Sequence, residues 1–119
     1  MQDRWAIGYR KGTISPNFTD PTWIHPPPGR IYADPFLTVW ENQPWVFFED
    51  FDGHRGHIGA SPLLDFEARP ALQLDWHLSY PFLIEHDGEL FCIPEQHEAR
   101  EVALFRCQKF PDRWKKEIV

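Results

Sequence analysis

Carboxylate side chains recur at matching places in a repeated part of this chain. Glu49 ends an apolar run that begins at Trp45, and Glu95 ends a second apolar run 46 positions later. The first copy also carries Asp34 directly before a proline, where the second copy has Tyr80. Carboxylates exchange protons and accept hydrogen bonds, so they suit acid–base chemistry or the binding of a polar ligand. Asp34, Glu49 and Glu95 are therefore the candidate catalytic residues.

The repeat also predicts the architecture that must position these side chains. Residues 32–37, Tyr-Ala-Asp-Pro-Phe-Leu, correspond to residues 78–83, Leu-Ser-Tyr-Pro-Phe-Leu, and each copy continues through a polar turn into the apolar run. A period of about 40 to 50 residues built from short strands is typical of a β-propeller blade. We expect an all-β, β-propeller-like fold with two four-stranded blades and an N-terminal strand.

The 119 residues are expected to form a single domain. Residues 1–29 hold the N-terminal strand, over 5–10, and a proline-rich loop, before a first blade over 30–75 and a second blade over 76–119. Turn residues and alternation predict the strands of the first blade at 35–40, 45–49, 56–61 and 71–74. Those of the second blade are predicted at 81–85, 90–93, 101–107 and 114–119.

The hairpins predicted in the blades bring distant polar residues together. A hairpin returns the end of its second strand to the start of its first, which places Glu49 and Asp50 near Asp34 and Glu95 near Tyr80. The first strands of all propeller blades run in one direction beside the central channel. We therefore expect these five side chains around one rim, and a ligand at that rim.

Several residues combine hydrogen-bonding groups with flat or extended apolar surfaces, which suits contact with a ligand. The candidate ligand-binding residues are Trp23, Arg30, Asp50, Trp76, His77 and Tyr80. Structural roles stay open for some of them. Asp34 can accept backbone N–H groups in its loop, Tyr80 can serve packing, and an exposed glutamate can pair with arginine. Trp40 and Trp45 are expected to pack between the blades.

Composition argues against several partners. The chain has 12 Lys and Arg against 18 Asp and Glu, a formal net charge of −6, so the basic surface of a nucleic-acid-binding protein is not expected. No apolar stretch approaches the roughly 20 residues of a membrane helix, and the first residues do not resemble a signal peptide. We expect a cytoplasmic protein without nucleic-acid or membrane partners.

The cysteines and histidines do not predict a metal or cofactor site. Cys92 and Cys107 lack the paired spacing of a zinc site and are expected to be strand residues inside the fold. His54 and His57 lie near Asp50, but a zinc site needs three or four convergent ligands. We therefore expect neither a metal nor another cofactor.

The motifs taken together resemble a known module. They comprise residues 32–37, Phe-Phe-Glu-Asp at 47–50, residues 77–82 with Glu-His-Asp-Gly at 85–88, Ile-Pro-Glu at 93–95, and residues 105–107 with 110–114. This set is similar to the N-terminal β-propeller domain of glucosamine inositolphosphorylceramide transferase-like proteins. That family is related to the five-bladed propellers of family 43 glycoside hydrolases. The resemblance covers nearly the whole chain and about two blades.

The resemblance implies a propeller associated with sugars. In the related hydrolases an aspartate of an Asp-Pro motif in the first blade is the general base, and Asp34 matches it. Inverting hydrolysis needs a second carboxyl group roughly 6.5 to 9.5 Å away, yet the second blade offers Tyr80 at the matching position. The favoured function is therefore sugar or glycan binding. A glycoside hydrolase whose site is completed by another chain, and a structural or interaction module without a small ligand, stay open as alternatives.

The number of blades indicates assembly. Closed propellers usually contain about 4 to 8 blades, whereas this chain supplies about two. Two blades alone would leave sheet edges and one face open, which favours association. We expect a homo-oligomer that closes the propeller.

Overall fold

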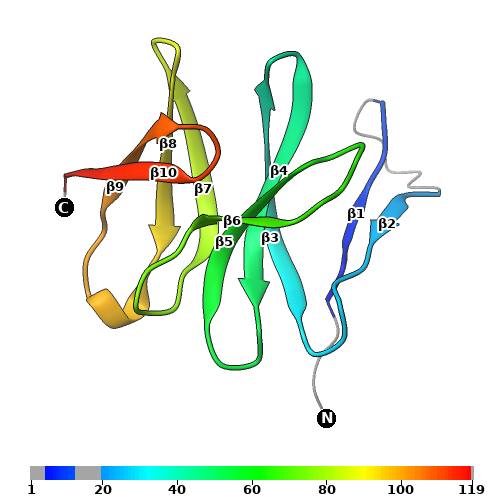
Figure 1. Cartoon of the computed structure of the whole chain (residues 1–119), viewed down its shortest axis with the longest axis horizontal. Helices are drawn as coiled ribbons and strands as arrows, with labels where there is room; N and C mark the ends of the chain where they lie inside the picture. The colour runs from blue at the N-terminus through cyan, green and yellow to red at the C-terminus, as the bar shows by residue number, and fades with distance from the viewer. Residues whose placement is uncertain (1–4, 13–19, 119) are drawn as a thin grey trace.

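The computed structural model describes residues 5–12 and 20–118, and this part of the chain is an all-β protein (Figure 1). Its strands form three antiparallel sheets, one of two strands and two of four. The helical content of the described residues is one short 3₁₀ helix, η1 (His97–Ala99). The all-β prediction is confirmed.

Strand order follows the chain closely. The N-terminal strand pair joins β1 (Ile7–Tyr9) to β2 (Thr22–Ile24). The first sheet contains, in spatial order, β3 (Ile31–Trp40), β4 (Gln43–Phe51), β5 (Gly56–Pro62) and β6 (Arg69–Leu72). The second sheet contains β7 (Ser79–His86), β8 (Glu89–Glu95), β9 (Leu104–Lys109) and β10 (Arg113–Ile118).

The structure differs from the sequence-based strand assignment in a few places. β2 lies inside the segment predicted to be a proline-rich loop. The prediction missed this strand because its three residues, followed by prolines, are too few to show the alternation that indicates a strand. The strand predicted from residue 101 starts at Leu104, since η1 and a turn come first. The last predicted strand corresponds to β10, and Val119 lies outside the described residues.

The repeat in the sequence is also a repeat in the backbone. Asp34 and Tyr80 both have positive φ angles, 54° and 46°, and each lies at a register shift between the first two strands of its sheet. After the shift, Phe36 pairs with Phe47 just as Phe82 pairs with Ile93. Positive φ is uncommon for residues other than glycine, and a β-bulge re-aims the side chains around it. Each of the two sheets therefore contains a bulge, and the two bulges lie at the same repeat position.

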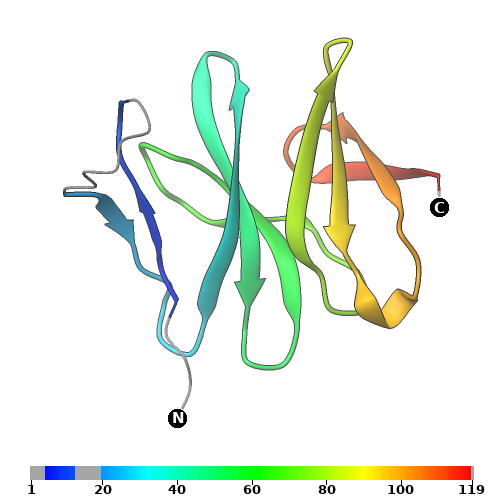
Figure 2. The same cartoon turned by 180° about the vertical axis from the view of Figure 1, so that it is seen from behind.

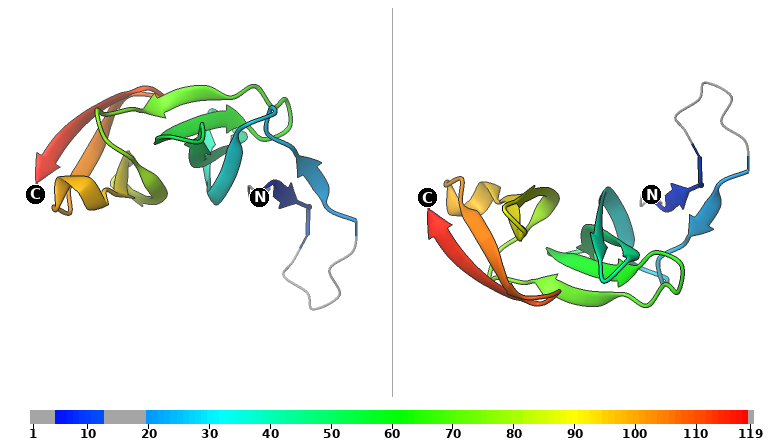
Figure 3. Two further views of the ribbon diagram at one scale, coloured as in Figure 1. Left: turned by 90° about the horizontal axis from the view of Figure 1, so that it is seen from below. Right: turned by 90° about the horizontal axis from the view of Figure 1, so that it is seen from above.

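The three sheets lie in a row in chain order (Figure 2). Seen along the strands, they follow an arc with β6 and β10 on its outer side (Figure 3). In this arrangement β3 and β7 approach each other, and the first sheet is enclosed between the strand pair and the second sheet.

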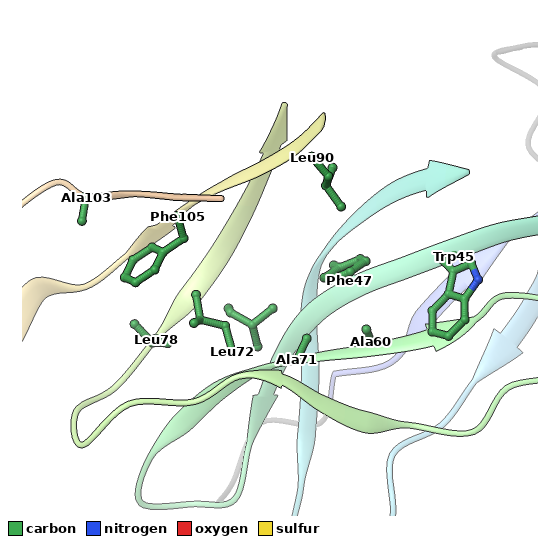
Figure 4. Packing of buried hydrophobic residues seen from close by; sticks show 10 residues of the cluster. Trp45, Phe47, Ala60, Ala71, Leu72, Leu78, Leu90, Ala103 and Phe105 are labelled. Carbon is green, nitrogen blue, oxygen red and sulfur yellow. The ribbon is translucent and has the colours of Figure 1, made fainter. Parts of the chain in front are cut away.

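Each four-stranded sheet has two faces, which correspond between the two repeats. We call the face bearing Phe47 or Ile93 the forward face and the face bearing Val46 or Cys92 the rear face. The forward face of the first sheet packs against the second sheet, where Phe47 joins Leu78 and Phe105 in one buried cluster (Figure 4). Burial of such apolar side chains is the main favourable contribution to folding.

The rear face of the first sheet packs against the N-terminal strand pair. Val46 and Phe48 are fully buried there with Ile7 and Ile24. At the other interface, Trp40 stacks on Phe110 of the second sheet with ring centroids 4.5 Å apart. Trp45 meets the same Phe110 ring edge-on, with centroids 4.9 Å apart. The expectation that both tryptophans pack between the sheets is confirmed.

Candidate functional site

The candidate site lies where β4 and β8 end and β3 and β7 begin, at the lower edge in Figure 1. Glu49 is registered opposite Ala33, the neighbour of Asp34, and Glu95 is registered opposite Ser79, the neighbour of Tyr80. These pairings confirm the proximity that the hairpin geometry predicted. The charges of Asp34 and Glu95 both act on Glu49, so the three carboxyl groups form one cluster, which we call the acidic rim.

His77 is the partner that holds Glu49 in this cluster. The backbone N–H of Gly56 donates to His77 Nδ1 at 2.8 Å. Nδ1 must therefore be the unprotonated ring nitrogen, which leaves the hydrogen on Nε2. His77 Nε2 lies 3.0 Å from Glu49 Oε2 and donates to it. A neutral imidazole thus orients the Glu49 carboxyl group.

Gly56 makes this arrangement possible because it leaves space for its neighbours. A Cβ atom at Gly56 would lie 2.6 Å from the Leu78 carbonyl oxygen and 2.8 Å from His77 Cε1. It would also lie 3.0 Å from Glu49 Oε2. The carbonyl belongs to the backbone and cannot move aside cheaply. The close approach of β5 to the segment before β7 therefore depends on the missing side chain.

Burial raises the pKa of Glu49 above its usual range, and the nearby carboxylates Asp34 and Glu95 raise it further, against the lowering effect of His77. The side chain of Glu49 is 15% exposed. Desolvation disfavours the charged form of a carboxyl group, and neighbouring negative charges act in the same direction. Glu49 therefore keeps a proton to higher pH than an ordinary glutamate, and it can donate a hydrogen bond as well as accept one.

A cavity of about 380 Å³ opens beside this cluster. Its polar lining is Asp34 and Glu49, and its apolar lining includes Trp5 and Phe51. The volume lies within the roughly 300 to 1,000 Å³ of small-molecule sites. Trp5 is 57% exposed, so much of its ring is available to a ligand. An aromatic wall and two carboxyl groups thus face one space.

Trp5 is the site residue that the sequence did not indicate. It was assigned to the expected N-terminal strand, but β1 begins only at Ile7, and Trp5 precedes it. Trp5 continues the alternation of Ile7 and Tyr9, so no local signal distinguishes it from the other residues of that expected strand. Its place beside Asp34 depends on how the strand pair docks on the first sheet, which the local sequence does not encode.

Asp50 is expected at the same rim, but the structure places it on the rear face, together with the candidate ligand-binding residue Arg30. Adjacent residues of a strand point to opposite faces, so Asp50 lies on the rear face while Glu49 lies on the forward face. Asp50 is buried and accepts a hydrogen bond from Arg30 Nε at 2.8 Å. His57 Nε2 lies 3.6 Å from the other Asp50 oxygen.

The remaining candidates have different environments. Trp23 is 56% exposed on β2, with its ring near His25. Trp76 is partly buried against the core, and its indole N–H donates to Gln96 Oε1 at 3.1 Å, so it is held in place rather than presented to solvent. Tyr80 is 48% exposed and meets the Phe36 ring edge-on. Of these, Tyr80 lies beside the acidic rim, because its neighbour Ser79 is registered opposite Glu95.

Within residues 5–12 and 20–118, no group of three or more His, Cys, Asp or Glu side chains is arranged to hold a metal ion. In the same part of the chain, no helix has the length and apolar character needed to cross a membrane.

Residues 23–119 match the protein family described as glucosamine inositolphosphorylceramide transferase 1, N-terminal. The chain is 38% identical over 99 residues to glucosamine inositolphosphorylceramide transferase 1 of Arabidopsis thaliana. It is 37% identical over 99 residues to the proteins of the same name from Oryza sativa subsp. indica and subsp. japonica. These alignments cover 77% of this chain but only 13% of each relative. No solved structure matches significantly. The chain belongs to the family of the N-terminal region of glucosamine inositolphosphorylceramide transferase 1.

Proposed function

We propose that this domain binds carbohydrate in the cavity beside the acidic rim. The observation that carries the proposal is the shared lining of that cavity by Trp5, Asp34 and Glu49. The C–H face of a sugar ring can pack on an exposed indole, and sugar hydroxyls can donate to carboxylate oxygens. The name of the relatives, glucosamine inositolphosphorylceramide transferase 1, also fits a carbohydrate-related role.

A glycan array followed by calorimetry of any sugar that binds tests this function. We expect Trp5→Ala and Asp34→Asn to weaken binding at least tenfold, because each removes one wall of the cavity. Trp23→Ala is the matched control, since Trp23 is about as exposed as Trp5 but lies on β2 outside the cavity. Equal binding by all three variants, or no glycan bound by the wild type, would refute the proposal.

A glycoside hydrolase is the second candidate, and it is favoured by one observation. Glu49, with its raised pKa, lies beside a further carboxyl group, Asp34, which is the combination of acid and base that glycosidases use. Hydrolysis of aryl glycosides tests it, with Asp34→Asn as the inactive control. Activity that survives this substitution would point to a contaminating enzyme.

A structural or interaction module without a small ligand is the third candidate. This reading would be favoured if no sugar bound to the chain and if the only effect of Asp34→Asn were a change in the stability of the fold. The open forward face of the second sheet supports this reading, because Phe82 is 44% exposed there and Ile93 is partly exposed.

We also propose that the two four-stranded sheets are propeller blades, over 30–75 and 76–119, and that further blades from copies of this chain close the ring. The support is the packing mode, in which the rear face of one sheet covers the forward face of the sheet before it. Light scattering tests closure. A stable folded monomer at micromolar concentration would contradict it.

A further inference from the structure

A second cavity lies on the rear face of the first sheet, away from the acidic rim, and has a volume of about 520 Å³. Tyr32 of β3, Asp50 of β4 and His57 of β5 line it. These residues form one row across the sheet, because Asp50 is registered opposite Tyr32 on one side and opposite His57 on the other. One wall of the cavity therefore carries hydrogen-bonding side chains from three neighbouring strands.

Asp50 is buried in this wall, yet one of its oxygens lacks a donor. The Asp50 side chain is 9% exposed, and its Oδ1 accepts a hydrogen bond from Arg30 Nε at 2.8 Å. His57 Nε2 lies 3.6 Å from Asp50 Oδ2, which is too far for a hydrogen bond. Within residues 5–12 and 20–118, Oδ2 accepts no hydrogen bond. A buried carboxylate oxygen without a donor is costly, so it indicates a donor from outside this part of the chain.

Arg30 supplies donors beside this carboxylate. Its bond to Asp50 uses the Nε hydrogen, and it is the one hydrogen bond of the Arg30 side chain within the described residues. A guanidinium group has five N–H donors in a rigid fork, so the four on its terminal nitrogens are available to a ligand. The cavity thus offers a fixed acceptor and fixed donors next to each other.

The side chains of this wall carry no excess charge. Arg30 and Asp50 compensate each other, and burial lowers the pKa of His57, so its imidazole is neutral near pH 7. Arg69 borders the cavity, but its guanidinium carbon lies 5.4 Å from the centre of the Trp45 ring, on the forward face. The wall therefore suits a neutral ligand that both donates and accepts hydrogen bonds.

We propose that this cavity binds a neutral polyol, such as a sugar ring, through two adjacent hydroxyl groups held by Asp50 and Arg30. A hydroxyl group is both a donor and an acceptor, so one can donate to Asp50 Oδ2 while its neighbour accepts from a terminal nitrogen of Arg30. The partly exposed Phe66 ring, 5.8 Å from the Tyr32 ring between centroids, adds an apolar wall for the C–H groups of the ligand.

This site is separate from the acidic rim, and it rests on the proposed function only in the class of ligand. Glu49 and Asp50 are adjacent in β4 and point to opposite faces of the sheet. Binding at one site therefore does not require binding at the other.

Titration of the ¹⁵N-labelled chain tests the proposal. The probes with adjacent hydroxyl groups are trans-1,2-cyclohexanediol and the methyl glycosides of glucose, galactose and mannose. Cyclohexanol, with one hydroxyl group on the same ring as the diol, is the control. We expect saturable shifts of the backbone signals of Arg30, Tyr32 and His57 with the diol and with at least one glycoside. Cyclohexanol should bind at least fivefold more weakly than the diol.

Variants separate a built site from a general effect of charge. Asp50→Asn should weaken binding of the diol at least tenfold, because it removes the carboxylate acceptor. Asp52→Asn is the matched control, since it makes the same change at an exposed aspartate outside the cavity and should leave binding unchanged. Arg30→Lys keeps a positive charge beside Asp50 but removes the fork, so it should weaken binding at least fivefold. It provides the test if Asp50→Asn loses the circular dichroism spectrum of the folded chain.

Three results would overturn the proposal. The first is the absence of saturable shifts around Arg30 with the diol and all three glycosides. The second is equal affinity for cyclohexanol and the diol, which would mean that apolar contact alone drives binding. The third is unchanged binding by a folded Asp50→Asn or Arg30→Lys variant. Trp5→Ala should abolish sugar-induced shifts at the acidic rim and leave those around Arg30, so failure at the two sites is distinguishable.

Discussion

The two four-stranded sheets have the same backbone plan but different surroundings. The first sheet is covered on both faces, by the strand pair and by the second sheet, and Val46, Phe47 and Phe48 are fully buried. The second sheet is covered on its rear face, where Cys92 is 1% exposed, while Ile93 on its forward face is only partly buried. Equivalent residues therefore contribute differently according to their neighbours in space.

The same contrast holds at the bulges. Glu49 is enclosed by His77, which precedes the first strand of the second sheet, and by Gly56 at the start of β5. Glu95, its counterpart, is exposed at the end of β8. Burial of a carboxyl group shifts its pKa, whereas exposure leaves it solvated. A repeated sequence thus yields one chemically distinct copy because only that copy has the next sheet beside it.

The largest expected effect comes from truncating the equivalent core residues Phe47 and Ile93. Phe47→Ala should lower the free energy of unfolding by about 3–5 kcal/mol, because it leaves a cavity at a fully buried site. Ile93→Ala should cost less, about 1–2 kcal/mol, because the side chain is partly exposed. Urea unfolding followed by circular dichroism measures both. Equal losses would show that something covers the forward face of the second sheet, such as another copy of the chain.

Gly56→Ala should remove what distinguishes Glu49 from Glu95. The added Cβ would meet the Leu78 carbonyl oxygen at 2.6 Å, and overpacking of this kind typically costs about 1–3 kcal/mol. The matched control is Gly8→Ala, where the new Cβ would meet the ring of Trp23, an exposed side chain that can move. Thermal unfolding compares the two. A control as damaging as Gly56→Ala would mean that loss of strand flexibility, rather than the clash, dominates.

Glu49→Gln should change how stability depends on pH. Because the pKa of Glu49 is raised in the folded chain, the folded state binds more protons than the unfolded state above the ordinary value of 4.5. Wild-type stability should therefore fall as pH rises from 4.5 through the raised pKa of Glu49. Glu49→Gln should remove this part of the fall, and it should raise stability at neutral pH relative to the wild type.

Glu95→Gln is the control for this measurement, since Glu95 is the exposed counterpart and the fall should persist. Melting temperatures between about pH 4 and pH 7 give the comparison. Identical profiles for Glu49→Gln and the wild type would show that another group causes the pH dependence.

The smallest effect is expected at Cys92, which occupies the repeat position of Val46. Both residues are fully buried on rear faces, so Cys92→Val should cost less than about 1.5 kcal/mol. Burial raises the pKa of the Cys92 thiol to about 12, so the native thiol should not react with a disulfide reagent at neutral pH. Rapid modification of Cys92, or a loss as large as that of Phe47→Ala, would show that the rear face of the second sheet is open.

The sequence determined much of the fold and part of the site. A segment repeated at 46 residues, with turn residues between apolar runs, was enough to predict two four-stranded sheets, because β-hairpins are built from neighbouring residues. Hairpin geometry also placed Glu49 near Asp34. The sequence pattern could not reveal β2, whose three residues show no clear period. The expectation of a single rim also missed that Asp50 and Glu49, which are adjacent in β4, lie on opposite faces of the sheet.

Only the tertiary structure decided which groups meet across sheets. Trp5 reaches the cavity of Asp34 through docking of the N-terminal strand pair, and His77 reaches Glu49 because Gly56 lets the second sheet approach. Hairpin contacts follow from local spacing, whereas contacts between sheets depend on how whole apolar faces pack, and no short stretch of sequence encodes that.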